Sequence, residues 1–228
     1  MAKAGEKLYN PVQGDWIVFG QTAEDTGGEL MSGELLVAPS GGNPLHVHPL
    51  QEEHFEVLSG TFGVQIGDER RSLGEGEKAT VPPGTPHRWF NEDDQQEARV
   101  SVELRPALNT ETFFETLYGL ARDGRTDESG VPNPLQLAVM LNGLHKDEIY
   151  LAKPPMPVQK VLFALLSPFG KLVGYKDHYP KYSAPETPSG KGAGPPSTTS
   201  VMVRALAIVG ALVVASSFLI GRTRRRSR

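Results

Sequence analysis

The chain has 228 residues, of which 38% are hydrophobic and 22% charged, and it contains no cysteine. This length allows one full domain with additional segments, and the lack of cysteine excludes disulfides, a thiolate nucleophile, zinc fingers and iron–sulfur clusters. Residues 201–228 hold six arginines and no acid, so the first 200 residues, with 17 basic and 27 acidic side chains, carry a net charge of −10. That acidic body argues against a nucleic-acid partner, because phosphate contacts need a clustered basic face.

Short stretches typical of strands follow one another through the first half of the chain, separated by Gly, Pro, Asn and Asp. We expect strands at residues 16–19, 30–38, 53–58, 61–66, 78–81, 87–90 and 99–105. Gly67-Asp68 is typical of a hairpin turn, and no helical periodicity interrupts the region. The pattern predicts a mainly β fold, an antiparallel sandwich or barrel, over residues 1–106.

Helical spacing replaces this pattern after Pro106. We expect helices at residues 110–121, 135–144 and 158–173, the last kinked at Pro168. The first would present an apolar stripe of Phe113, Phe114, Leu117 and Leu120. These helices are too few and too apolar to stand alone, so we expect residues 107–182 to pack on the outside of the barrel. Residues 183–200 are mostly Pro, Gly, Ser, Thr and Ala, which predicts a flexible linker.

Candidate metal ligands gather in two stretches of the predicted β region. His46 and His48 are two residues apart, so on a strand their imidazoles leave the same face. Glu53 follows across a short turn, and His87 follows a Pro-Pro-Gly turn in the second stretch. Three neutral imidazoles and one carboxylate suit a divalent transition metal such as Fe, Mn, Ni, Zn or Cu, and they leave coordination positions open. The pattern therefore predicts one bound metal ion.

These stretches resemble the two sequence motifs of the cupin superfamily, which are small jelly-roll barrels. In the first motif His46, His48, Glu53 and Gly60 occupy the motif positions, and Ser40 departs from an expected glycine. The second motif is matched throughout, by Gly76, Pro82, Gly84, His87 and Asn91. The resemblance covers about residues 15–106 and implies a jelly-roll barrel whose metal ligands are those four side chains. Jelly-roll cupins are often dimers, so it also implies a homodimer.

The alternation of side chains along a strand predicts which way the neighbours of the candidate ligands point. Phe55 and Val57 share the inward phase of Glu53, and Trp89 shares that of His87, so we expect all three to line the pocket. An ordinary core position is the alternative for Trp89. Glu52 and His54 should point to the opposite face. His145 and His178 lack ligand spacing, and we take them as incidental.

The C-terminal end predicts a membrane anchor. Residues 201–221 are apolar all round, and their uncharged part, 205–221, has 17 residues, the lower limit for crossing a bilayer. The alternative, a buried helix, has nothing to pack against between the linker and the basic tail at 222–228. The N-terminus lacks the apolar region of a signal peptide, so we expect a membrane-anchored protein with its barrel in the cytoplasm.

The basic tail also favours a cytoplasmic C-terminus, which a single span cannot satisfy. Either residues 158–173 form a second membrane element, or the short basic tail crosses the membrane against the rule that positively charged segments stay in the cytoplasm. A packed or interfacial helix is the better interpretation of residues 158–173, because only ten uncharged residues separate Lys160 from Lys171.

Two functions from different classes remain open. The first is a mononuclear metal enzyme acting on a small organic molecule, with dioxygen chemistry by resemblance and Glu53 as the proton acceptor if it detaches from the ion. The second is a non-catalytic module that binds or senses a small molecule. The fold alone does not decide between them, because it hosts many functions.

Overall fold

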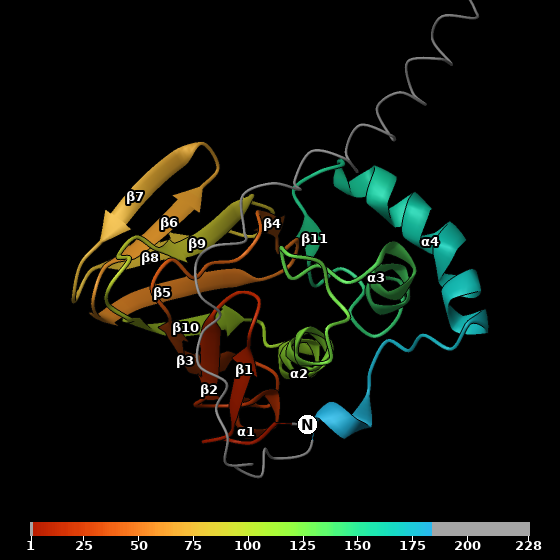
Figure 1. The fold of residues 1–228 in the computed structure, drawn as a ribbon, viewed down its shortest axis with the longest axis horizontal. Coiled ribbons are helices and arrows are strands. Elements are labelled where there is room, and N and C mark those ends of the chain that lie inside the picture. Colours follow the sequence, from red (N-terminus) through yellow and green to blue (C-terminus); the bar gives the residue numbers. More distant parts are fainter. Residues whose placement is uncertain (1, 184–228) are drawn as a thin grey trace, which may run out of the picture. The chain divides into compact units, whose positions relative to one another are not determined.

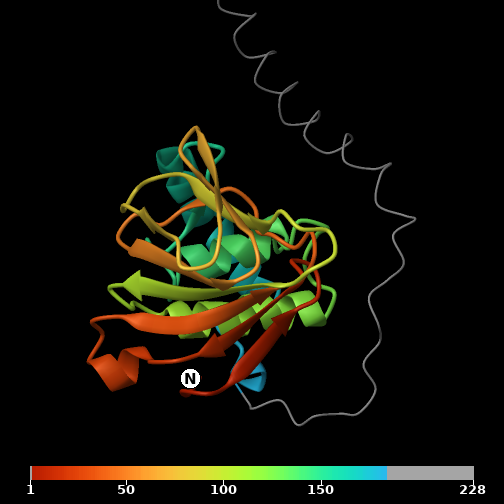
Figure 2. The same ribbon diagram turned by 90° about the vertical axis from the view of Figure 1, so that its left-hand side faces the viewer.

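The computed structural model describes residues 2–183, which form two antiparallel sheets with helices gathered on one side of them (Figures 1 and 2). One sheet has the order β1-β2-β3-β10-β5-β8, and the other has the order β11-β4-β9-β6-β7. The strands are β1 Lys7–Asn10, β2 Asp15–Phe19, β3 Met31–Val37, β4 His46–Val47, β5 Glu52–Ser59, β6 Phe62–Ile66, β7 Glu69–Leu73, β8 Lys78–Val81, β9 His87–Asn91, β10 Ala98–Arg105 and β11 Tyr150–Leu151. The expected mainly β fold is confirmed.

Alternating burial along the strands builds the core between the sheets. On β5 and β10 the inward residues are buried, and every second residue faces outward. Phe55 contacts Phe62, which stacks at 6.2 Å from Trp89 on the neighbouring strand β9. These aromatic contacts belong to one cluster that fills the barrel.

The glycines and the asparagine of the two motifs have structural explanations. Gly60 and Gly84 have φ values of 81° and 77°, a left-handed conformation that favours glycine. The Gly84 N–H donates to the carbonyl of His48 at 2.8 Å, which fixes the turn of the second motif against the strand of the first. The buried Asn91 amide donates to the carbonyls of Val37, Ala38 and Gln96. The motif residues therefore fix the backbone that carries the ligands.

Four strands (β1, β4, β7 and β11) and one short helix were not among the expected elements. The hairpin turn at Gly67-Asp68 is confirmed, but the strand that follows it, β7, is charged and mostly exposed and pairs only with β6. Strand β1 pairs only with β2, and the two-residue β11 pairs with β4 across about 100 residues of sequence. The expectation of no helix in the β region was wrong, since α1 (Ala23–Thr26) begins at a capping box formed by Thr22.

The helices after the barrel are α2 (Thr110–Arg122), α3 (Pro134–Leu141), α4 (Met156–Leu172) and a 3-10 turn at Pro180–Tyr182. Asn133 caps α3 by accepting from the N–H of Gln136. Asn109 precedes α2 but makes no such bond.

The apolar stripe of α2 divides between two clusters. Phe114 and Leu117 pack against the barrel core, whereas Phe113 and Leu120 join a second cluster that holds the helices together. Helix α2 is therefore the element that connects the two parts.

None of the helices within residues 2–183 is long and apolar enough to cross a membrane, and this includes α4. The predicted span at 201–221, the basic tail at 222–228 and the predicted linker beyond Ser183 lie outside the described residues. All three therefore remain predictions.

Candidate metal centre

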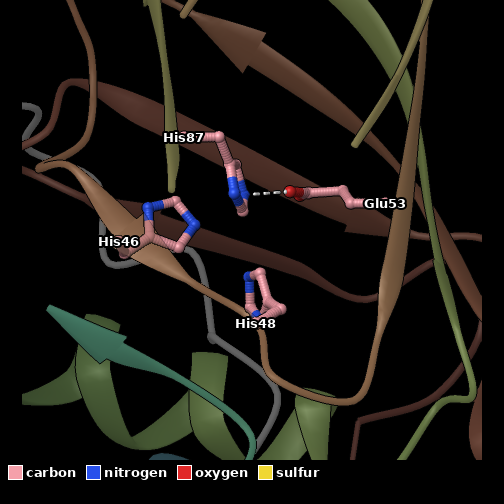
Figure 3. A group of neighbouring side chains, drawn as sticks. All are labelled: His46, His48, Glu53 and His87. Carbon is pink, nitrogen blue, oxygen red and sulfur yellow. Dashed lines mark hydrogen bonds and ion pairs between the residues drawn. The ribbon is translucent and has the colours of Figure 1, made fainter. Parts of the chain in front are cut away.

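Both sheets contribute to one cluster of side chains. His46 on β4 lies directly opposite His87 on β9, and His48 follows His46 on the same extended stretch. Glu53 comes from β5 in the other sheet. The four side chains point toward one centre (Figure 3), and one donor atom from each lies within 4.8 Å of all the others. Each of the four residues is between 0% and 9% exposed, so the cluster is inside the protein.

Backbone carbonyls fix the orientation of the three imidazoles. Each Nδ1 lies 2.9 Å from a main-chain oxygen, that of Pro44 for His46, Glu148 for His48 and Thr85 for His87. Because a carbonyl only accepts, each Nδ1 must carry its proton, which leaves Nε2 as the nitrogen available to a metal. Such outer partners of ligand histidines are a regular feature of metal sites.

The electrostatics of the cluster also suit a cation. Burial lowers the pKa of His46 well below its ordinary value and lowers the pKa of His48, so both imidazoles are neutral at pH 7. Burial opposes protonation of His87 as well, but the hydrogen bond and charge of Glu53 outweigh burial and raise the pKa of His87. His87 Nε2 and Glu53 Oε2 are 2.8 Å apart, within hydrogen-bond distance. A bound metal cation would offer both side chains a positive charge in place of this proton.

Glu148 is the residue of this region that the sequence did not indicate. It lies 100 positions after His48, yet its carbonyl holds the His48 ring. Its buried carboxylate accepts from the N–H and the side-chain amide of Asn109 at 2.7 and 2.9 Å, and contacts His145 Nδ1 at 2.8 Å. His145, which we took as incidental, therefore belongs to the network that fixes Glu148. No spacing rule could have found a contact made through a main-chain oxygen.

A cavity of about 100 Å³ adjoins the cluster. His46, His48, Glu53 and Trp89 line it from the barrel, and residues of α2, α3 and the 148–151 segment line it from the helical extension. Phe55 and Val57 point inward but are not among its lining residues, and both belong to the barrel core. Strand phase gives the side of a sheet that a residue faces, but it does not give depth along the barrel, so these two residues face inward without lining this cavity. Part of the extension thus faces the site, although we expected it on the outside of the barrel.

Residues 33–103 match the family model described as Cupin domain. A probable oxidoreductase of Hypocrea virens, virH, is 30% identical over 155 residues, which cover 62% of this chain and 68% of that protein. The chain belongs to the cupin superfamily. This cupin is also 28% identical over 153 residues to an oxidoreductase of Arthrobotrys oligospora, and the match covers 61% of this chain but only 59% of the relative's length.

Solved structures resemble the barrel portion. The cupin aligns with TT1209 from Thermus thermophilus over 40% of this chain and 83% of that one, with 24% identity and a TM-score of 0.35. It aligns with KdgF from a Halomonas species over 41% of this chain and 79% of that one, with 19% identity and a TM-score of 0.37.

Proposed function

We propose that this cupin is a metal-dependent oxidoreductase that acts on a small organic molecule. The observation that carries the proposal is the cluster of His46, His48, Glu53 and His87, in which each Nδ1 is bound to a carbonyl and the site adjoins a cavity. The oxidoreductase names of two relatives support the same class of reaction.

The donor set fits a divalent transition metal, of which Fe, Mn, Ni, Zn and Cu all accept imidazole ligands. When bound, the metal would act as a Lewis acid, and a redox-active metal would also exchange electrons with the substrate. Burial keeps the imidazoles of His46 and His48 neutral and able to bind a cation, and the surrounding core limits the access of water. In this proposal Glu53 Oε2 accepts a substrate proton once it has detached from the metal. The hydrogen bond and charge of His87 outweigh burial and lower the pKa of the Glu53 carboxyl, which keeps that carboxyl ionised.

Metal content and dioxygen uptake test this proposal on the full chain. We expect one metal ion per chain by elemental analysis, its loss in His48→Ala, and its retention in His54→Ala. His54 is a matched control, because it bonds to Glu52 and Thr80 on the outer face of the barrel. Oxygen uptake or substrate oxidation that depends on this metal supports the enzyme. Metal and ligand binding without any turnover would instead favour the alternative, a non-catalytic binding or sensing module.

We also propose that residues 201–221 anchor the protein to a membrane with its barrel in the cytoplasm, and that the chain is a homodimer. The apolar composition of residues 201–221 supports the anchor. Protease accessibility in sealed vesicles, with reporters at both ends of the chain, tests the topology, and a barrel digested from outside the cell would contradict it.

A further inference from the structure

Polar and apolar groups divide the lining of the cavity. The metal ligands and Gln51 are polar, and the other polar residues of the lining are Gln13, Asn43, Thr110, Tyr118, Glu148 and Tyr150. The extension supplies an apolar wall, made of Phe113, Phe114, Leu117, Leu137, Leu141 and Ile149. A molecule in this cavity would therefore meet polar atoms at the metal centre and hydrocarbon along the extension.

Positive side chains do not take part in this lining. Within residues 2–183, the cavity is lined by no Lys or Arg, and its one ionisable carboxylate outside the metal cluster is Glu148. A carboxylate or phosphate on the ligand would lose its hydration without gaining a cationic side chain. The one cation that a ligand could meet is therefore the metal itself, so this distribution of charge favours an uncharged body for the part of the ligand that lies along the extension.

Three of the other polar groups in the lining bond to the protein itself. The Tyr118 hydroxyl bonds to Asp15, the Tyr150 hydroxyl to Asp147, and the Glu148 carboxylate to Asn109 and His145.

Gln51 differs from these groups. Its Nε2 donates to the Pro106 carbonyl and to Thr110 Oγ1, both at 2.8 Å, which fixes the orientation of the amide. Within the described residues its Oε1 has no partner at good hydrogen-bond geometry, although the residue is only 1% exposed, and the side chain lies beside His48, whose pKa it acts to raise. An amide oxygen only accepts, so it calls for an O–H or N–H donor on the ligand.

We infer that the cavity binds an uncharged single-ring molecule with one hydroxyl donor, a phenol or a compound of similar shape. The inference rests on the proposed function in placing the hydroxyl at the metal centre, near Gln51, with the ring against α2 and α3. A cavity of about 100 Å³ is of the same order as the roughly 150 Å³ apolar cavity that holds benzene, so its size favours a ligand with one ring.

Ligand titrations of the metal-loaded full chain test this inference. The Trp16→Phe variant leaves Trp89, which lines the cavity, as the one tryptophan reporter. We expect phenol to quench Trp89 and to bind about tenfold or more tightly than anisole, which lacks the hydroxyl donor, and benzoate, which adds a negative charge. Leu117→Phe should weaken phenol binding by filling the cavity. Leu166→Phe, in the second cluster and outside the lining, should not.

The outcomes separate this inference from the proposed function. Phenol binding without oxidation contradicts the enzyme and supports the ligand class. Equal binding of anisole and phenol, stronger binding of benzoate, or no binding of any ring compound to metal-loaded protein would overturn the ligand class.

A second, independent observation concerns the outer face of α4, which lies on the side of the helices away from the sheets (Figure 1). Seven of the eleven large hydrophobic side chains exposed within residues 2–183 lie on α4 or directly after it. They are spaced three or four residues apart and share one face: Val158, Val161, Leu162, Leu165, Phe169, Leu172 and Val173. We call this set the α4 face.

The charge around the α4 face is positive. Residues 149–176 contain four lysines, at 153, 160, 171 and 176, and no Asp or Glu, although the first 200 residues carry −10. Lys160 is paired with Asp147 at 2.8 Å, so this lysine is partly neutralised. An exposed apolar face on a helix that carries two lysines, Lys160 and Lys171, and no acid matches a bilayer that contains anionic lipid. If two copies of the chain paired through this face, their lysines would come together, and the helix itself would supply no acidic side chain to neutralise them.

We propose that the α4 face docks on the surface of an anionic membrane. The chain has no native cysteine, so Leu165→Cys takes one environment-sensitive fluorophore in the full chain, and Leu58→Cys on β5 is the control. We expect the 165 label to shift to the blue with vesicles containing phosphatidylserine, and the 58 label to stay unchanged. No shift at 165 would overturn the proposal. So would a 165 label that is buried before vesicles are added, because a second copy or another segment would then cover the face.

Discussion

The barrel and the helical extension contribute to the site in different ways. The barrel supplies all four candidate metal ligands, each from a strand or from the residue directly after one. The extension supplies none of them, but its Glu148 carbonyl orients His48 and its apolar side chains wall the cavity. The candidate metal ligands and the apolar wall of the cavity therefore come from different parts of one chain, which meet at α2 and at Glu148.

Removing the extension should have the largest effect. A fragment ending at Pro106 would expose core residues that Phe114, Leu117 and Tyr118 cover, so we expect it to aggregate or to unfold at much lower temperature. A fragment ending at Tyr182 should stay soluble. Thermal melts of the two fragments, followed by circular dichroism, make the test. Equal stability would show that the barrel folds independently of the extension.

Removing barrel ligands should abolish metal binding while keeping the fold. We expect His46→Ala/His87→Ala to lose more affinity than the 10–100-fold typical of an outer partner, because two of four donors are gone. Elemental analysis and circular dichroism measure the two properties on the same sample. Full metal content in the double variant would show that this cluster is not the metal site.

The contact between Asp15 of the barrel and Tyr118 of the extension predicts a pH dependence. Burial raises the pKa of Asp15 to about 7, and the hydrogen bond from Tyr118 only partly offsets this. The folded state therefore holds a proton that the unfolded chain releases near pH 4. The free energy of unfolding should fall as pH rises from about 4 to about 7, by at most roughly 4 kcal/mol from this group.

Urea unfolding across this pH range, compared between the parent chain and Asp15→Asn, isolates that contribution. The variant cannot ionise, so its stability should depend less on pH. Identical pH profiles for the two proteins would show that Asp15 is ionised in the folded state.

Loss of the Glu148 side chain should weaken metal binding without removing any ligand. Glu148→Ala leaves Asn109 and His145 without their buried acceptor, so the carbonyl that holds His48 should move. We expect metal affinity to fall about 10–100-fold, the range typical of outer partners. Glu128→Ala, at an exposed position of the extension, is the control. Competition with a chromogenic chelator measures the affinities. Unchanged metal affinity in Glu148→Ala would show that the extension forms the wall of the cavity but does not help to orient His48.

What the sequence could predict differs between the two regions for a physical reason. In the barrel, side-chain identity and spacing define the features: the alternation of β5, the positive φ at Gly60 and the separation of His46 from His48 follow from local sequence. The helices of the extension were also predictable, and the structure places their ends within a few residues of the expected ones.

The features that the sequence did not predict depend mostly on contacts between residues far apart in the chain. Strand β11 exists because Tyr150 pairs with Val47, and Glu148 acts through a main-chain oxygen that every residue has. Neither leaves a pattern in the sequence. The exposed strand β7 lacks apolar alternation because it lies at the edge of its sheet.

A double-mutant cycle on metal affinity, with His48→Ala, Glu148→Ala and their combination, tests most directly whether the extension completes the barrel's metal centre. If Glu148 acts by orienting His48, its replacement matters only while His48 is present, so the account predicts that Glu148→Ala has little further effect in the His48→Ala background. Thermal melts confirm that each variant is folded at the temperature of the assay. Equal losses from Glu148→Ala with and without His48 would show that the two residues act independently, and would contradict the account.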